Sequence, residues 1–371
     1  METFETFPLP EDMQVIDSHT HIHSSFQFTE SGASISCAQL LEAYRQNGEF
    51  SHIAVLAIPY LRDRDVCQNL MVALMKLNNP NVFGYGGLVY PDQPVTLPFR
   101  GGLSPEEQLD DLLAVGFDGI KMLESKPNAR KLLGLALDDM AYDPFFSKLE
   151  QQQTHLIWHV NDPDNFWDPQ TFRGTGLNPA WCYAGEGFLS YEEIYSEVFH
   201  VLERHPNLNV TFAHLFFMSE QPDRLEALFE KYPRLCVDLA PGIEMFPGMS
   251  SAQPRWKEIF TKYADRIVFS TDHAPMSARI QKPIAPSYLY RFLLTEDHFT
   301  FYTGKQIQGL GLEKDIVRKI LAGNFLRQTG GAPKPICRDA LKAYLQKYEP
   351  LITHAENKAC IFAQCETEGL L

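Results

Sequence analysis

Residues 15–23 read Val15-Ile16-Asp17-Ser18-His19-Thr20-His21-Ile22-His23, an apolar start followed by histidines at alternate positions. The apolar start predicts a buried β-strand. Because side chains alternate between the two faces of a strand, His19 and His21 project to the same side, about 6–7 Å apart. Two imidazoles at this spacing can bind one divalent metal ion. The alternative is a polar strand end whose histidines simply meet solvent.

Seven further apolar segments follow along the chain, and helical patterns lie between them. The predicted strands are residues 15–21, 52–58, 82–89, 117–123, 154–160, 209–215, 234–240 and 266–272. The predicted helices are residues 36–47, 62–78, 104–115, 138–151, 190–205, 222–231 and 256–263. Two of these helices begin with a capping box, Ser104 with Glu107 and Ser190 with Glu193. Eight strands in regular alternation with helices favour a closed (β/α)8 TIM barrel, an α/β fold, over a doubly wound sheet.

The chain of 371 residues is predicted to form a single domain with three parts. Residues 1–14 are a lead-in, residues 15–286 form the barrel, and residues 287–371 form a helical C-terminal extension. Within the extension, residues 287–348 are predicted to be helical and the order of the tail is left open. Two Pro/Gly-rich patches, 91–105 and 241–254, fall where strand-to-helix loops belong.

A long insert, residues 161–189, follows the fifth predicted strand. It therefore lies at the end of the barrel that carries active sites. Its aromatic residues and Arg173 predict either a lid over an organic, anionic substrate or a long loop that packs on itself.

Composition narrows the class of protein. A formal net charge of −15 without a basic stripe argues against a nucleic-acid partner. No apolar run approaches the ~20 residues that span a bilayer, and the acidic N-terminus lacks the pattern of a signal peptide. Seven scattered cysteines without Cys-x-x-Cys spacing indicate reduced thiols. We therefore expect a cytoplasmic protein without a membrane partner, and a homo-oligomer is a further expectation because barrels of this kind often self-associate.

Polar side chains capable of binding metal lie at the ends of the predicted strands. They are His19, His21, His159, His214 and Asp272, with Lys121 near the end of the fourth strand. Singly, each has an ordinary structural role: a histidine bonded to a core carbonyl, or an aspartate that caps a helix. In a (β/α)8 barrel, however, the carboxyl ends of all strands meet at one rim. Their convergence at that rim predicts a metal site.

These strand ends also resemble the motifs of the amidohydrolase superfamily. The motifs are Ile16-Asp17-Ser18-His19-Thr20-His21, Gly119-Ile120-Lys121, Trp158-His159, Phe212-Ala213-His214 and Phe269-Ser270-Thr271-Asp272. The closer resemblance is to its amidohydrolase 2 branch of metal-dependent hydrolases and decarboxylases, which includes aminocarboxymuconate semialdehyde decarboxylase. Residues 320–326, Ile-Leu-Ala-Gly-Asn-Phe-Leu, resemble the superfamily's C-terminal segment, so that the resemblance covers residues 15–328.

The resemblance implies that His19, His21, His159 and Asp272 hold a divalent cation. Zn²⁺ is expected with Mn²⁺ as the alternative, and one ion is favoured over two. His214 is implied to contact substrate or metal-bound water, and Asp272 to act as general base.

Three roles stay open for Lys121. It is a carboxylated bridge between two metals, a contact to a substrate carboxylate, or a member of a structural ion pair. Asp17 is expected to orient other groups, His273 to be a loop residue rather than a ligand, and His23 to be solvated.

The expected function is hydrolysis of a C–O or C–N bond in a small carbonyl compound, a lactone, amide or ester, by metal-activated water. The alternative is non-oxidative decarboxylation of an unsaturated or aromatic acid. Several decarboxylases of the branch carry a glutamate near the first-strand histidines, whereas this chain reads Gln14-Val15-Ile16-Asp17, which favours the hydrolase. A non-catalytic binding barrel is the third hypothesis, and the complete set of ligands argues against it. In each case the expected partner is a small organic molecule, with a carboxylate-bearing substrate foreseen.

Overall fold

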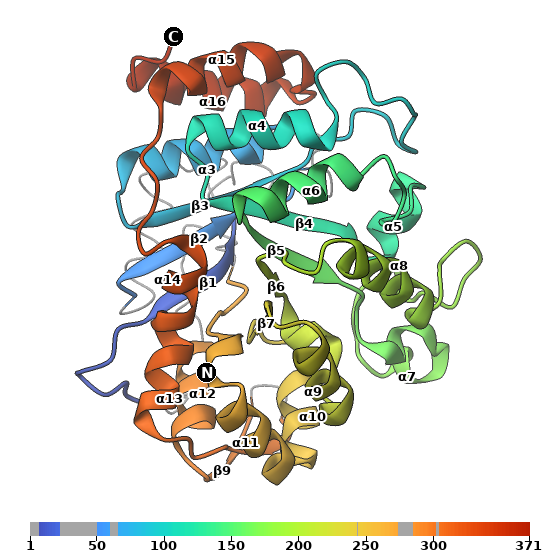
Figure 1. Ribbon diagram of the computed structural model, residues 1–371, viewed down its shortest axis with the longest axis vertical. Helices are drawn as coiled ribbons and strands as arrows, with labels where there is room; N and C mark the ends of the chain where they lie inside the picture. Colours follow the sequence, from blue (N-terminus) through green and yellow to red (C-terminus); the bar gives the residue numbers. More distant parts are fainter. Residues whose placement is uncertain (1–6, 23–49, 60–65, 243, 274–284, 302–303) are drawn as a thin grey trace.

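The computed structural model describes residues 7–22, 50–59, 66–242, 244–273, 285–301 and 304–371. Its eight main strands form one sheet in which every strand pairs in parallel with the next one along the chain (Figure 1). They are β1 Ile16–His21, β2 His52–Leu56, β3 Val82–Gly87, β4 Gly119–Ser125, β5 His155–Val160, β6 Val210–Phe212, β7 Leu235–Asp238 and β8 Ile267–Val268. Helices flank the sheet, and the predicted TIM-barrel fold is confirmed.

Backbone hydrogen bonds join β1 to the segment that directly follows β8. The amide of Asp272 donates to the carbonyl of His19 at 2.9 Å, and the amide of His21 donates to the carbonyl of His273 at 2.8 Å. The amide of Ser18 donates to the carbonyl of Phe269 at 3.3 Å. The segment after β8 thus runs alongside β1 and brings both ends of the sequence motif together.

The helices pack around the outside of the sheet and continue past the last strand. Those between strands are α3 Cys67–Asn78, α4 Pro105–Val115, α5 Pro127–Leu133, α6 Asp143–Gln152, α8 Tyr191–Arg204, α9 Pro222–Lys231, α10 Met245–Ser251 and α11 Gln253–Lys262. The C-terminal part contains α12 Ala285–Leu294, α13 Lys314–Arg318, a π-helical turn Lys319–Gly323, α14 Asn324–Thr329, α15 Arg338–Tyr348 and α16 Ala355–Thr367. Figure 1 shows α15 and α16 lying over α3 and α4. Both predicted capping boxes are present, at Ser104 and Ser190.

The structure corrects several predicted elements. Residues 287–348 are not all helical, because β9 His298–Thr300 and β10 Gln306–Gln308 form an antiparallel pair. The loop predicted over residues 241–254 contains α10, and α5 was not predicted. Both are short helices, and α10 includes Pro247 and Gly248, which have low helix propensity. The predicted helix 36–47 and His23 lie outside the described residues.

Strands β6 and β8 are shorter than predicted. They end at Phe212 and Val268, so His214 and Asp272 lie on the turns that follow the strands. Both residues have positive φ, 58° and 54°. A left-handed backbone cannot continue a strand, so neither His214 nor Asp272 can belong to the strand that precedes it.

The barrel has an apolar interior to which α14 contributes. Ile16, Phe83, Ile157 and Val268 are buried there together with Phe325 of α14. Apolar side chains of this size each contribute about 1.5–3 kcal/mol to the stability of the folded protein when they are fully buried. His19, His21 and Asp272 lie at the C-terminal end of the barrel, where the strands finish.

Candidate metal centre

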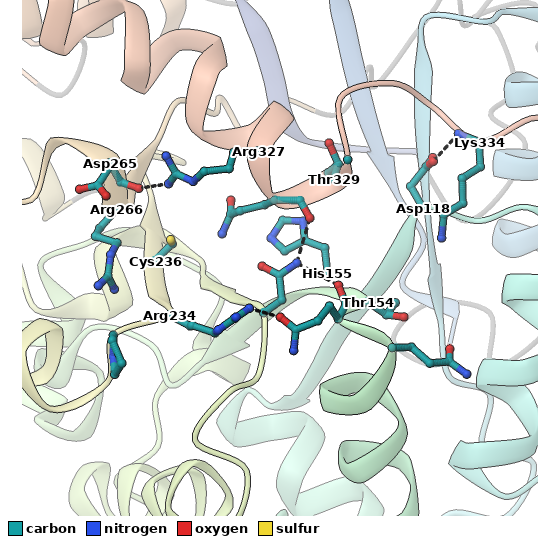
Figure 2. A pocket seen from close by; sticks show the side chains of 16 residues that line it. Asp118, Thr154, His155, Arg234, Cys236, Asp265, Arg266, Arg327, Thr329 and Lys334 are labelled. Atoms are coloured by element: carbon teal, nitrogen blue, oxygen red, sulfur yellow. Dashed lines mark hydrogen bonds between the residues drawn. The ribbon is translucent and has the colours of Figure 1, made fainter.

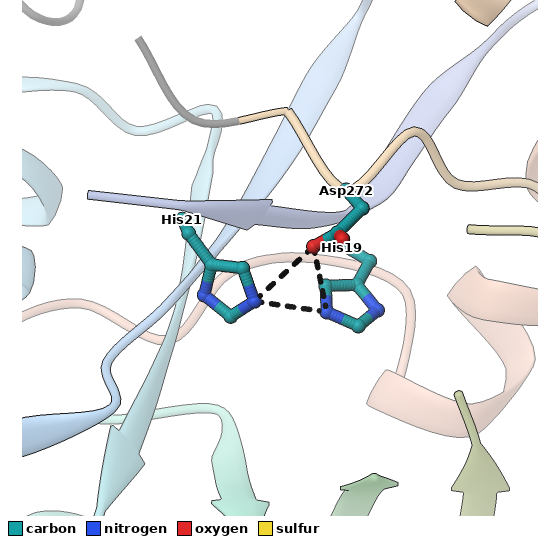
Figure 3. A group of neighbouring side chains, drawn as sticks. All are labelled: His19, His21 and Asp272. Atoms are coloured by element: carbon teal, nitrogen blue, oxygen red, sulfur yellow. Dashed lines mark hydrogen bonds and ion pairs between the residues drawn. The ribbon is translucent and has the colours of Figure 1, made fainter. Parts of the chain in front are cut away.

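Three side chains converge at the C-terminal end of the barrel. One donor atom each from His19, His21 and Asp272 lies within 4.8 Å of the others. The two Nε2 atoms are 3.1 Å apart, and Asp272 Oδ1 is 3.6 Å from that of His19 and 3.4 Å from that of His21 (Figure 3). The histidines project from one face of β1, as the alternation of a strand dictates, and Asp272 reaches them because its segment bonds to β1.

The far nitrogen of each imidazole is fixed by an acceptor. Nδ1 of His19 lies 2.7 Å from Asp238 Oδ2, and Nδ1 of His21 lies 2.9 Å from the carbonyl oxygen of Leu56. An acceptor at Nδ1 keeps the proton there and leaves the Nε2 lone pair directed into the site. Burial lowers the pKa of both imidazoles well below the usual value. The rings are therefore neutral, which is the state that binds a metal, and this donor set fits a divalent cation.

Asp238 is a functional residue that the sequence reasoning missed. Its carboxylate is 1% exposed on β7 and also accepts from the amides of His214, at 2.8 Å, and Ala240, at 3.0 Å. One side chain thus orients His19 and the turn that carries His214. The available signal was an acidic residue at the end of the apolar segment Leu235-Cys236-Val237.

Lys121 lies directly beside the three converging side chains. It projects from β4 with 2% of its surface exposed, and its Nζ is 3.1 Å from His19 Nε2. Burial lowers the pKa of its ammonium to about 8, against the opposing charges of Asp238 and Asp272. Within the described parts of the chain, no carboxylate oxygen lies within the 4.0 Å of an ion pair with Nζ.

His214 and His159 continue the row of imidazoles away from His19. The ring centroid of His214 is 5.5 Å from that of His19 and 4.9 Å from that of His159. Nδ1 of His214 lies 2.9 Å from the carbonyl oxygen of Ala240. Nε2 of His159 faces Asp162 Oδ1 at 3.3 Å, so His159 lies outside the three-residue group. Burial lowers the pKa of both imidazoles.

The turn that carries His214 has an unusual backbone. His214, Leu215, Phe216 and Phe217 have φ values of 58°, 53°, 58° and 51°. Left-handed conformations cost non-glycine residues about 1–2 kcal/mol each. Packing and hydrogen bonds offset this cost. The ring of Phe216 stacks on that of Phe212, with ring centroids 4.0 Å apart, and the Tyr195 hydroxyl donates to the Phe216 carbonyl at 2.7 Å.

Asp162 connects the insert 161–189 to this row of histidines. It accepts from Lys126 Nζ at 2.5 Å and from the hydroxyl of Tyr183 at 2.5 Å, and it faces His159. The insert contains three short helices: η1 Asp164–Trp167, α7 Pro169–Arg173 and η2 Pro179–Trp181. It has a small core of its own formed by Phe166, Phe172 and Tyr183, whereas Arg173 is exposed. The insert therefore packs on itself, and its role as a lid stays a prediction.

Two further acidic residues near the site have distinct environments. Asp17, one layer below His19, accepts from the amide and hydroxyl of Thr271, at 3.1 and 2.5 Å, and so positions the segment that carries Asp272. Glu244 precedes α10, and both its carboxylate oxygens are buried without a hydrogen-bond partner among the described residues. Burial raises its pKa to about 7, and the charges of Asp162 and Glu220 act in the same direction.

Comparison with known proteins agrees with this fold. The decarboxylase LigW for 5-carboxyvanillate from Sphingomonas paucimobilis superposes with a TM-score of 0.50 at 13% identity, over 86% of this chain and 99% of that one. The 2,6-dihydroxybenzoate decarboxylase from Rhizobium gives 0.52 at 16%, with 86% and 99% covered. IDCase from Metarhizium anisopliae gives 0.53 at 14%, with 86% and 98% covered. No curated protein sequence matches the chain.

Among the described helices, none has the length and apolar character needed to cross a membrane. The family model described as amidohydrolase matches residues 16–327, which is most of the chain. The chain therefore belongs to the amidohydrolase family.

Proposed function

We propose that this protein is a metal-dependent hydrolase that cleaves a C–O or C–N bond of a small carbonyl compound, such as a lactone, amide or ester. The observation that supports this proposal is the convergence of His19, His21 and Asp272 donors within 4.8 Å at the C-terminal end of an amidohydrolase-family barrel. These three residues would hold a divalent cation, which would activate a water molecule and polarise the substrate carbonyl. Zn²⁺ suits this mixture of imidazole and carboxylate donors, and Mn²⁺ is the alternative.

The chain's own residues have separable roles in this proposal. His19 and His21 would hold the cation through Nε2, and Asp238 and the Leu56 carbonyl keep their rings in place. Asp272 has a side chain 37% exposed, so its carboxylate can take a proton from water and deliver it to the leaving group.

Three more residues surround the proposed cation. His159 is proposed as a further ligand, in competition with its contact to Asp162. His214 is proposed to bind a substrate oxygen. Lys121 is proposed to bind a substrate carboxylate, because its buried ammonium lies beside the site without a carboxylate partner among the described residues.

Non-oxidative decarboxylation on the same ligands is the second candidate. It is supported by the similar structures of decarboxylases for 5-carboxyvanillate and 2,6-dihydroxybenzoate, and by the position of Lys121, which suits a carboxylate. A non-catalytic binding barrel is the third candidate. We also propose a cytoplasmic protein, which the six described free cysteines support, and a homo-oligomer, which light scattering would test.

Metal analysis and a substrate panel distinguish these candidates. We expect about one Zn²⁺ per chain in the purified protein, lost in His21→Ala and Asp272→Asn but retained in His200→Ala, an exposed histidine on α8. A ratio near two that falls in Lys121→Ala would instead indicate a bridging lysine. The panel contains lactones, amides, esters and aromatic acids. Release of CO2 without addition of water would indicate the decarboxylase, and absence of both metal and turnover would indicate the binding barrel.

A further inference from the structure

A cavity opens at the N-terminal end of the barrel, at the opposite end of the strands from the candidate metal centre. Figure 2 shows the side chains that line this cavity. Its volume is about 630 Å³, within the usual range of small-molecule sites. His155, the first residue of β5, lies at its floor, and Asn209 and Arg234 lie just before β6 and β7. Arg266, Arg327 and Lys334 complete its cationic lining.

The four cations of this cavity have no carboxylate partner among the residues that the structure describes. Arg234 donates to the Gln153 side chain, and Arg266 donates to the carbonyls of Tyr232 and Leu235. Arg327 donates to the backbone carbonyl of Asp265, and Lys334 contacts Asp118 through its backbone amide alone. In the described parts of the chain, none of the four forms an ion pair.

Arginines elsewhere on the molecule are usually paired. Arg130, Arg204, Arg224 and Arg255 each form an ion pair with a carboxylate. On a chain with a net charge of −15, acidic partners are abundant. Two carboxylates also line the cavity, those of Asp265 and Asp118, and Asp118 pairs with Lys76 at 2.6 Å. The three arginines and the lysine outnumber these carboxylates and have no ion-pair partner among the described residues, so they leave a local excess of positive charge, which attracts an anion.

The floor of the cavity is polar and neutral. His155 lies 2.6 Å from the Tyr85 hydroxyl and 2.9 Å from the Thr211 hydroxyl, and burial lowers its pKa to about 3. The side-chain amide of Gln328 donates to Thr211 at 2.9 Å. Its carbonyl oxygen Oε1 is buried and has no partner among the described residues. An acceptor in this position is suited to a hydroxyl group.

We propose that this cavity binds a small hydroxylated anion that carries phosphate or carboxylate groups. The anionic groups contact Arg234, Arg266, Arg327 and Lys334, and the hydroxyl donates to Gln328 Oε1. Guanidinium groups bind phosphate and carboxylate in a bidentate manner. A ligand with two anionic groups can contact several of these cations at once and is therefore expected to bind most tightly. This site is independent of the proposed metal centre, which lies at the other end of the strands.

Calorimetric titration with inorganic pyrophosphate and with citrate tests the site. The wild-type protein is expected to bind at least one of them saturably with one ion per chain. The double variant Arg234→Gln/Arg327→Gln is expected to bind at least tenfold more weakly, and Lys334→Gln to weaken binding to a smaller extent. Arg100→Gln removes the same charge from an exposed loop outside the cavity and should bind as the wild type does.

Two further measurements distinguish binding in this cavity from binding at the metal centre and from loss of the fold. His21→Ala should bind the anion as tightly as the wild-type protein does, because the anion does not bind at the metal centre. Thermal unfolding of each variant verifies that it is folded. Tighter binding of pyrophosphate indicates a phosphate ligand and tighter binding of citrate a carboxylate ligand. The proposal is overturned if neither anion binds saturably, if the double variant binds as tightly as the wild type, or if the affinity is lost in His21→Ala.

Discussion

At Asp238, a single carboxylate accepts three hydrogen bonds: from His19 Nδ1, from the amide of His214 and from the amide of Ala240. The first bond determines which nitrogen of His19 faces the candidate metal centre. The other two hold the turn after β6, where the backbone is left-handed. Asp238 is thus a positioning residue for both histidines.

Asp238→Asn should weaken metal binding about 10- to 100-fold. Asparagine keeps an oxygen for the two amides, but its NH2 group can face His19 Nδ1 and favour the tautomer whose proton lies on Nε2. Competition against a fluorescent zinc chelator measures the affinity. Asp223→Asn, on the exposed surface of α9, is the matched control. Unchanged zinc affinity with an unchanged melting temperature would show that Asp238 has no such role.

Glu244 makes stability depend on pH. Its folded pKa is raised to about 7 from 4.5, chiefly by burial. The neutral carboxyl group is therefore the form that the folded protein favours. Its contribution to the free energy of unfolding is fully present below about pH 4.5 and is lost as pH rises through 7. Glu244→Gln removes the ionisation, so it should stabilise the protein by about 2 kcal/mol at pH 8.5 and leave it unchanged at pH 4.5.

Melting temperatures of wild type and Glu244→Gln across this pH range measure the effect. Glu366→Gln, a change of the same kind on the exposed surface of α16, is the matched control. Parallel pH curves for Glu244→Gln and the wild type would contradict the assignment of the raised pKa.

The insert 161–189 is attached to the barrel through the Tyr183 hydroxyl and Asp162. Tyr183→Phe removes a hydrogen bond to a charged group, which is usually worth about 1.5–3 kcal/mol. We expect faster amide hydrogen exchange in residues 163–188, and a higher KM if the insert covers substrate. Tyr195→Phe removes another buried hydroxyl, on α8, and should leave exchange in the insert unchanged. Equal exchange in the wild type and Tyr183→Phe would show that the insert is held by its own core.

The elements that the sequence predicted well are those with strong local signals. Helix α9 spans the predicted residues 222–231, and the capping boxes at Ser104 and Ser190 start α4 and α8 as expected. The strands were recognisable as apolar runs. The pair β9–β10 and helix α10 are short, and tertiary contacts rather than propensity decide their conformation.

The candidate site was predictable only in part, because its parts come from distant segments. The spacing of His19 and His21 placed them on one face of a strand, and the barrel topology placed Asp272 near them. The contacts of His159 with Asp162, and of Asp238 with His19, depend on side-chain packing across strands. No local pattern contains that information. The left-handed turn at His214 likewise depends on packing of its phenylalanines.

Across the whole molecule, the two ends of the barrel carry different chemistry. The C-terminal end gathers neutral imidazoles and carboxylates around the candidate metal centre, while the N-terminal end gathers arginine and lysine side chains around a polar cavity. Between them lies an apolar interior that includes Ile16, Ile157 and Val268. The two proposed sites can therefore be altered separately.

Asn324, the residue that opens α14, connects this helix to the segment around β8. Its side-chain amide donates to the carbonyls of Ala264 and Ile267 at 2.8 and 2.7 Å, and it is fully buried. The next residue, Phe325, packs against Phe83 inside the barrel, with ring centroids 5.0 Å apart. These contacts hold the short strand β8, and the chain leads directly from there to Asp272.

Asn324→Ala should therefore destabilise the protein and disturb the metal centre. It leaves two buried carbonyls without their donor, at a cost of about 1–3 kcal/mol each, so we expect the melting temperature to fall by several degrees. Gln306→Ala, on the exposed β10, changes stability by only about 0.5 kcal/mol or less. Because β8 positions Asp272, zinc affinity should fall in Asn324→Ala even at temperatures where the variant is folded. A lowered melting temperature with unchanged zinc affinity would mean that the bonds of Asp272 and His273 to β1 hold the metal centre without support from α14.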